Sequence, residues 1–408
     1  MPSERMEEIL AAHLSELEST GRAKGAETVF CGVVAPEGGK GPRYLLAGEG
    51  ERRYLRMNSN SYLGMSLNSE VQGAEEAAVH TLGAGPGAVR FISGTWSAHT
   101  ALEQRLAKFH GRQSAMIFSS AYATVMGVLP QLIDGETVVI SDALNHNCII
   151  NAIRLARPKE KRVYAHLDFA ELDRILSECS ETCRRALVIT DGIFSMRGDH
   201  APLDEIMALA EKYDFLIFAD ECYSEIYRDT PPTGALEVVK ELGTDRNRVV
   251  IFHSLSKRSN LPGLRSGFAA SGPETMREIK QLRNYAGAPL PLPLQQAAAA
   301  VWADEAHVEE NRALYQEKYA IADRIFGNVP GYASPEAGFF LWLPVEDDEA
   351  AALKLWRETG VRVLPGSYLA QNVAGENPGQ NYIRVALVAP KDETTRGLEA
   401  IRDCLYST

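Results

Sequence analysis

The chain has 408 residues, of which 45% are hydrophobic and 24% charged, with a formal net charge of -12. This length can bury a large core and favours one large and one smaller domain. The negative charge argues against a nucleic-acid surface, and no stretch approaches the ~20 apolar residues of a membrane span. Six scattered cysteines without paired spacings favour reduced thiols over a metal site. With no signal-peptide core, we expect a cytoplasmic protein.

The first 57 residues predict a helix followed by an arm. Between residues 4 and 22, apolar residues recur on one stripe, which is the spacing of an amphipathic helix. After a Gly-rich connection, residues 44–46 and 53–57 predict a hairpin. We expect residues 1–57 to join the small C-terminal domain.

Residues 58–292 predict a large α/β domain. From about residue 70, short apolar strands alternate with helical segments, which implies a parallel or mostly parallel sheet covered on both faces. The strands are predicted at residues 115–118, 137–141, 162–166, 186–190, 215–219, 249–252 and 267–270.

Residues 293–408 predict a linking helix and a small α+β domain. Pro291 and Pro293 interrupt the alternating pattern, and one long helix is predicted over residues 294–325. The small domain follows, with strands predicted at residues 338–343, 361–364 and 382–387 and with flanking helices.

The most specific motif follows the strand at residues 249–252. Ser254 and Ser256 precede Lys257, and a Pro-Gly turn leads on to Arg265. A lysine amine can form an imine with an aldehyde, while hydroxyls and an arginine can hold a phosphate. This combination suits pyridoxal 5'-phosphate. A surface basic loop is the competing interpretation, but such a loop would not follow an apolar strand with Ser, Pro and Gly at these spacings.

An acidic partner for such a cofactor is available at Asp220. It closes the apolar strand at residues 215–219, which places a carboxylate at the sheet edge where α/β proteins bind ligands. A carboxylate there could keep the ring nitrogen of the cofactor protonated. Taken alone, an aspartate after a strand is more often a helix cap, and only its partnership with Lys257 favours the cofactor.

Three further positions follow strands or lie on one. Ser119 to Ala123 open a helix, so the amides of Ala121 and Tyr122 could bind the phosphate, although a plain strand-to-helix connection is the alternative. His146 could stack on the ring or be an ordinary loop histidine. Arg384, on a small-domain strand, could grip a substrate carboxylate or form a surface ion pair.

The lysine-bearing half resembles class I/II aminotransferases. The run from Ser254 to Gly267 is similar to their Ser-x-Ser-Lys-x-x-x-x-Pro-Gly-x-Arg-x-Gly signature, and Asp220-Glu221-Cys222-Tyr223 is similar to their Asp-Glu-x-Tyr. The likeness extends to the group acting on N-succinyl-diaminopimelate. The resemblance implies that Lys257 forms a Schiff base, that Asp220 pairs with the pyridinium and that Tyr223 donates to the phenolic oxygen of the ring.

The preceding half, residues 58–210, resembles α-oxoamine synthases instead. The matching runs are residues 60–64, 89–95, 141–146 and 190–196. This resemblance implies that His146 stacks on the ring, that Ser195 contacts the phenolic oxygen and that Asn60 contacts substrate. A synthase would carry His where Tyr223 stands, and the aminotransferase Asn-Pro pair is missing. The chain therefore reads as a mosaic of the two families with a join near residues 210–220.

Both families share fold type I of the pyridoxal-phosphate-dependent transferases. The resemblance therefore implies an aspartate-aminotransferase-like α/β fold, with a seven-stranded, mostly parallel sheet and a small α+β domain. It also implies a homodimer with active sites at the interface and small-molecule substrates. We expect no nucleic acid, membrane or metal as a partner. We predict an aminotransferase that moves an amino group to a 2-oxo acid through Lys257. The alternatives are a synthase that condenses an amino acid with an acyl-CoA, releasing CoA and CO2, and a cofactor-binding mosaic with little turnover.

Overall fold

A computed structural model describes residues 2–19, 29–38, 41–54, 67–85, 89–180, 182–283, 290–370 and 377–406. The chain forms two compact units, Met1–Arg56 and Met57–Thr408. The finer division at residues 57/58 and 292/293 stays a prediction. Among the described helices, none combines the length and apolar character that a membrane crossing requires.

The first unit contains helix α1 (Pro2–Ser19) and the antiparallel strands β1 (Phe30–Val34) and β2 (Arg43–Leu46). Strand β1 was not predicted, and it is the partner of β2. Of the predicted hairpin partner at residues 53–57, only Tyr54 reaches β2, through a single bridge to Tyr44. A turn through Glu49 occupies the intervening residues, and residues 55–57 lie outside the described part.

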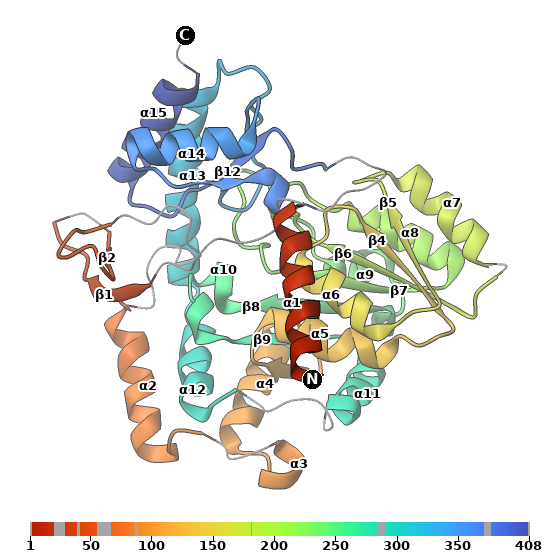
Figure 1. The fold of residues 1–408 in the computed structure, drawn as a ribbon. Helices are drawn as coiled ribbons and strands as arrows, with labels where there is room; N and C mark the ends of the chain where they lie inside the picture. Colours follow the sequence, from red (N-terminus) through yellow and green to blue (C-terminus); the bar gives the residue numbers. More distant parts are fainter. Residues whose placement is uncertain are drawn as a thin grey trace. The chain divides into compact units, whose positions relative to one another are not determined.

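The second unit is built on a seven-stranded sheet (Figure 1). Strand β9 runs antiparallel to both of its neighbours, and the other strand pairs are parallel. In order across the sheet, the strands are β3 (Ala115–Phe118), β9 (Gly267–Ala270), β8 (Val249–Ser254), β7 (Leu216–Asp220), β6 (Arg185–Asp191), β4 (Thr137–Asp142) and β5 (Glu160–Tyr164). The predicted mostly parallel seven-stranded sheet is confirmed.

Both faces of this sheet are buried, which is why its strands are apolar without alternation to polar residues. Along β7, Ile217 and Ala219 belong to one core and Phe218 to the other. The first core contains residues of α4 (Ser97–Phe109), α7 (Phe169–Ser180), α8 (Leu203–Tyr213), α9 (Ala235–Leu242) and α12 (Leu292–Val301). The second contains residues of α5 (Ala121–Leu132), α6 (Asn147–Ala156) and α11 (Pro273–Arg283). Helix α2 (Ser69–Leu82) packs on α12, and the short helix α3 (Arg90–Ser93) precedes α4.

The single helix predicted over residues 294–325 is wrong. Two helices occupy this stretch, α12 and α13 (Ala306–Phe326). Between them, Asp304 Oδ1 accepts the amide of Ala306 at 2.9 Å, and Asp304 Oδ2 lies 2.9 Å from His307 Nδ1. An aspartate that bonds nearby backbone in this way competes with helix continuation and starts a new helix.

The C-terminal part forms a small antiparallel sheet in the order β10-β12-β11, with its own apolar core. Its strands are β10 (Phe340–Pro344), β11 (Leu364–Pro365) and β12 (Tyr382–Ala386), and its helices are α14 (Asp348–Thr359) and α15 (Lys391–Leu405). Helix α13 contributes to the same core. This is the predicted α+β arrangement, although β11 is shorter than the predicted strand at residues 361–364.

Candidate active site

A cavity of about 200 Å³ lies at one edge of the large sheet. The residues that line it are Ser120, Ala121, Tyr122, His146, Cys148, Asp191, Ile193, Ser195, Asp220, Cys222, Tyr223, Ser256, Lys257, Pro262 and Arg265. This set contains every predicted cofactor contact except Ser254.

The topology of the sheet explains why these residues meet. The parallel strands β4, β6, β7 and β8 end at the same edge, and His146, Ser195, Tyr223 and Lys257 follow those ends. Strand β9 is antiparallel, so it begins at this edge, two residues after Arg265. Segments distant in sequence are thus brought to the position where open α/β sheets bind ligands.

Lys257 and Asp220 occupy neighbouring strand ends. Lys257 lies on the one-turn helix α10 (Leu255–Arg258), and its Nζ is 5.0 Å from the centre of the Tyr223 ring. Asp220 is buried, and its Oδ1 accepts the amide of Cys222 at 3.1 Å, which fixes the carboxylate at the cavity wall. The cavity therefore holds an amine, a phenol ring and a buried carboxylate together.

His146 caps helix α6 through its own ring. Its Nδ1 accepts the amide of Cys148 at 3.2 Å and lies 2.9 Å from the Cys148 thiol. The pKa of His146 is lowered, chiefly because the surrounding protein desolvates the ring; the charge of Asp220 opposes this shift, and the charges of Lys257 and Arg384 add to it. The ring is therefore neutral, with Nδ1 as the acceptor and the proton on Nε2.

Asp191 is a second buried carboxylate at the same edge, and the sequence analysis did not select it. It pairs in register with Asp220, one strand away. Its Oδ2 accepts the amide of His146 at 2.9 Å. Burial, reinforced by the charge of Asp220, raises the pKa of Asp191 well above its ordinary value. The available signal was that Asp191 closes an apolar strand just as Asp220 does.

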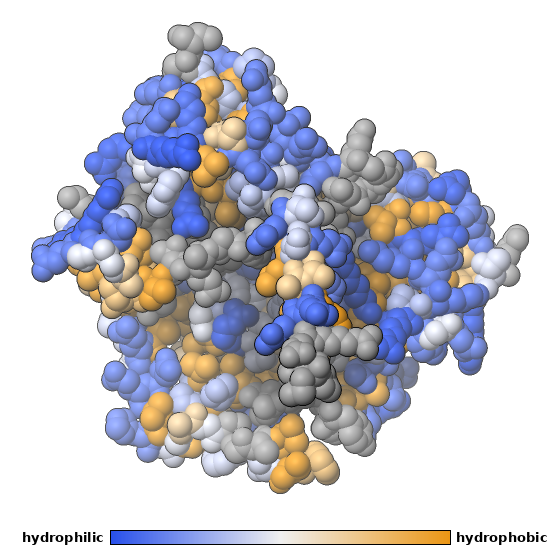
Figure 2. Space-filling view, viewed as in Figure 1, coloured by the Kyte–Doolittle hydropathy of each residue, from blue (hydrophilic) through white to orange (hydrophobic). Residues whose placement is uncertain are grey.

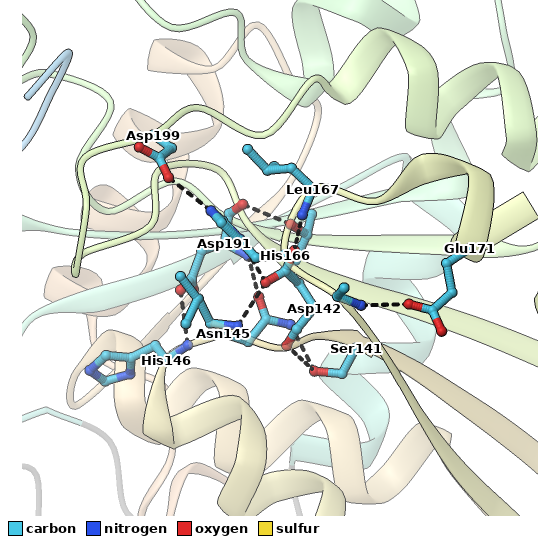
Figure 3. Close-up of polar contacts among 12 residues, drawn as sticks. Ser141, Asp142, Asn145, His146, His166, Leu167, Glu171, Asp191 and Asp199 are labelled. Atoms are coloured by element: carbon cyan, nitrogen blue, oxygen red, sulfur yellow. Dashed lines mark hydrogen bonds and ion pairs between the residues drawn. The ribbon is translucent and has the colours of Figure 1, made fainter. Parts of the chain in front are cut away.

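A polar network behind the cavity joins two of its loops (Figure 3). His166 Nδ1 lies 3.0 Å from Asp142 Oδ1, and its Nε2 lies 2.8 Å from Asp199 Oδ2. Burial alone would lower the pKa of His166, but the two carboxylates more than offset this and raise it. Asp142 lies at the start of the loop that carries His146, and Asp199 on the loop that carries Ser195, so the network couples the two loops.

The start of helix α5 fits an anion. Ser120 Oγ accepts the amide of Ala123 at 2.9 Å, while the first amides of a helix have no acceptor within it. A Cβ on Gly267 would lie 2.4 Å from the Ala121 nitrogen, so only glycine allows β9 to pass this close. With Ser256 and Arg265 on the same wall, the donor set fits the phosphate of pyridoxal phosphate.

Among the described residues, two predicted site residues, Ser254 and Arg384, do not line the cavity. Ser254 caps α10, where its Oγ accepts the amide of Ser256 at 3.3 Å. Arg384 holds its guanidinium carbon 4.0 Å above the Phe340 ring, near enough for its charge to lower the pKa of His146. Asn60 lies outside the described residues. Besides Asp191, the lining residues that the sequence analysis did not select are Ser120, Cys148, Ile193, Cys222 and Pro262.

Comparisons with known proteins fit this architecture. Residues 52–401 match the family "Aminotransferase class I and II". The 8-amino-7-oxononanoate synthase of Exiguobacterium sibiricum is 32% identical over 397 residues, covering 96% of this chain and 95% of that protein. The mitochondrial 2-amino-3-ketobutyrate coenzyme A ligase of Homo sapiens is 41% identical over 229 residues, covering 56% and 53%. The solved structure of an aminotransferase from Neisseria meningitidis has a TM-score of 0.68 at 30% identity, covering 82% of this chain and 87% of that one.

The chain is a pyridoxal-phosphate-dependent transferase with fold type I, as its sheet, its cavity and these matches agree. It belongs to the class I and II aminotransferase family, which extends over residues 52–401.

Proposed function

We propose that the protein is an α-oxoamine synthase, which joins an amino acid to the acyl group of an acyl-CoA. The observation that carries this proposal is the 32% identity to an 8-amino-7-oxononanoate synthase over nearly the whole of both chains. The lysine motif by itself favours an aminotransferase, but it supplies only a few of the residues that line the cavity. A full-length similarity includes all of the segments that line it, and we therefore give it more weight than the motif.

In this proposal, each group of cavity residues contacts a different part of the cofactor. The amides of Ala121 and Tyr122, with Ser256 and Arg265, hold the phosphate. Asp220 pairs with the ring nitrogen, and the neutral ring of His146 stacks on the face of the pyridine. Ser195 and Tyr223 contact the phenolic oxygen, and Ser254 caps the short helix that carries Lys257.

When bound, pyridoxal phosphate supplies an aldehyde and an electron-withdrawing ring. Lys257 Nζ removes the proton from Cα of the amino acid, and Arg384 and Asn60 orient the substrate. A bond then forms between Cα and the acyl carbonyl carbon, the C–S bond of the thioester breaks, and CoA leaves as a thiol. The proton that Lys257 took from Cα passes to the departing sulfur, the amino-acid carboxyl group leaves as CO2, and Lys257 then delivers a proton from solvent to Cα.

A second candidate, transamination, is favoured by one feature of the site. Lys257 Nζ lies over the Tyr223 ring at 5.0 Å, and a tyrosine at this position is the aminotransferase pattern. In that reaction Lys257 would move the proton from Cα of the amino acid to the aldehyde carbon of the cofactor. Water would then release a 2-oxo acid, the amino group would stay on the cofactor, and no C–C bond would form.

We also propose that the chain acts as a homodimer in the cytoplasm. Helix α3 supports self-association, because Phe91 and Ile92 are 70% and 69% exposed. Figure 2 shows apolar side chains at the surface of this part of the molecule. Exposed apolar surface of this kind is typical of association sites.

A paired assay distinguishes the candidate reactions. Holoprotein is incubated with glycine or alanine and a panel of acyl-CoA thioesters of increasing chain length, and free CoA thiol is measured. In parallel, glutamate is supplied with 2-oxo acids, and formation of the new amino acid is measured. Thiol release that depends on the amino acid supports the synthase. Amino-group transfer without thiol release contradicts it. If neither product forms, the protein binds the cofactor but has little turnover.

Lys257→Ala tests the assignment of the amine. We expect the variant to lose the visible absorbance of the lysine-bound cofactor and at least about 1,000-fold of the turnover, because proton transfer at Cα loses its base. Arg258 is unsuitable as a control because it is fully buried, whereas Lys161, an exposed lysine on β5, is suitable for a Lys161→Ala control. An unchanged absorbance spectrum in Lys257→Ala would remove the assignment.

A further inference from the structure

Three polar residues follow Lys257, and all of them are buried. Arg258, Ser259 and Asn260 expose 1%, 0% and 0% of their surface. Burying polar side chains is costly unless each finds a hydrogen-bonding or ionic partner. The partners of these three residues therefore show which element the turn after Lys257 packs against.

Each of the three residues has a partner at the start of α13 or along it, and Arg258 also pairs at 3.6 Å with Glu225, which lies outside α13. Arg258 forms an ion pair with Glu305, the residue that precedes α13. Ser259 Oγ lies 2.9 Å from His307 Nε2. Tyr315 Oη, itself buried, donates to Asn260 Oδ1 at 3.1 Å. We call Glu305, His307 and Tyr315 the α13 clamp.

The α12–α13 break makes the clamp possible. Asp304 holds His307 through its Nδ1, which directs Nε2 toward Ser259. Arg258 is further enclosed by the rings of Phe109 and Trp302, whose centres lie 4.9 and 4.5 Å from its guanidinium carbon. A continuous helix over these residues would lack the Asp304 turn that presents Glu305 and His307.

The same helix also holds the small domain. Lys318 Nζ donates to the carbonyl of Leu387 at 2.9 Å, and Tyr319 Oη donates to the carbonyl of Gly338. Leu387 directly follows β12, the strand that carries Arg384. Helix α13 thus contacts both the turn of Lys257 and the strand of Arg384.

We propose that the α13 clamp is a positioning device that fixes the direction of the Lys257 amine relative to the small domain. The four residues of α10 form a single turn, which cannot hold a conformation on its own. Contacts on the three residues after Lys257 supply the missing constraint. This inference rests on the proposed role of Lys257, and its residues touch neither the cavity nor the substrate.

Two conservative variants test the clamp. Ser259→Ala and Tyr315→Phe each remove one hydroxyl and leave the chain otherwise intact. Glu317→Gln is the control, because Glu317 lies on the same helix but pairs at 2.9 Å with the exposed Lys391, away from the turn. Amide hydrogen exchange of residues 255–261 is measured in the holoproteins by mass spectrometry, together with the pH midpoint of the cofactor absorbance.

We expect exchange in this segment to be about tenfold faster in each clamp variant, since one lost buried hydrogen bond changes a local equilibrium by about that factor. The absorbance midpoint should shift in both clamp variants and stay at the wild-type value in Glu317→Gln. Exchange and midpoint equal to those of the control would overturn the clamp. If Lys257→Ala itself keeps the cofactor spectrum, the proposed function fails instead, whatever the exchange rates are.

Discussion

At the scale of single residues, an acid next to a cavity residue in the chain carries a charge that is costly to the fold. Glu221 is buried directly behind Asp220, and its Oε1 accepts the amide of Ala235 at 2.7 Å. Burial raises the pKa of Glu221 to about 7, in spite of that hydrogen bond, and the charge of Asp220 contributes in the same direction. The folded protein therefore binds this proton more tightly than the unfolded chain does.

The consequence is a loss of stability as the pH rises from about 4.5 to about 7, where only the folded state retains the proton. We expect this titration to lower the free energy of unfolding by up to about 3 kcal/mol. Glu221→Gln removes the titration but keeps an oxygen acceptor for Ala235. The free energy of unfolding of the variant should therefore rise relative to that of the wild type between pH 5 and pH 8. Urea denaturation at both values measures the gain, and a difference that is independent of pH would contradict the expectation.

The residues of the site were predictable to different degrees. Lys257, Asp220 and Tyr223 stand in motifs whose spacing carries the chemistry, and all three line the cavity. Asp191 and Cys148 were missed because their importance depends on register and on a helix start that no local pattern reveals. Residue types indicate the chemistry, whereas strand pairing determines which side chains line the same cavity.

At the scale of elements, His166 connects two loops of the cavity. The raised pKa of His166 means that its protonated form is stabilised by Asp142 and Asp199. A folded-state pKa above the unfolded one gives stability that is fully present below about pH 6.5. This stability is lost as the pH rises through the folded-state pKa.

His166→Gln should therefore destabilise the protein most at low pH. We expect a loss of roughly 1–3 kcal/mol at pH 5.5, because the buried Asp142 and the partly exposed Asp199 lose a charged donor, and a smaller loss at pH 8.5. His80→Gln, at an exposed site on α2, serves as the control and should change neither value. Chemical denaturation measures the free energy of unfolding at both pH values. A larger loss at pH 8.5 than at pH 5.5 would contradict the claim that protonated His166 stabilises the fold.

The elements themselves show where local patterns suffice. Each of the seven strands of the large sheet was predicted to within two residues at either end, because strands buried on both faces form short apolar runs between turn signals. The helix over residues 294–325 failed because apolar periodicity continues through both α12 and α13. The break depends on Asp304, whose side-chain hydrogen bonds a periodicity argument does not consider.

At the scale of the whole molecule, residues that resemble two families meet in one cavity. His146 and Ser195 come from the synthase-like half, and Tyr223 and Lys257 from the aminotransferase-like half. They line the same cavity because β4, β6, β7 and β8 belong to one continuous parallel ladder. The mosaic character therefore bears on the choice of reaction and leaves the architecture intact.

Self-association is the remaining property at this scale, and α3 allows a direct test. Phe91 and Ile92 together expose a large apolar surface on a helix of only four residues. If this surface is buried in a homodimer, Phe91→Glu combined with Ile92→Glu places two charges in an apolar interface, which costs several kcal/mol. We expect the wild type to sediment as a dimer and the double variant as a folded monomer with unchanged circular dichroism.

Leu353→Glu is the matched control, because Leu353 on α14 is 53% exposed and should tolerate a charge without change in mass. Sedimentation velocity at several protein concentrations separates weakened association from unfolding. If the active sites lie at the interface, the monomeric variant should also lose most of its bound cofactor, while Leu353→Glu retains it. A double variant that remains dimeric would show that α3 is not part of the interface, because two buried, unpaired carboxylates would not be tolerated there.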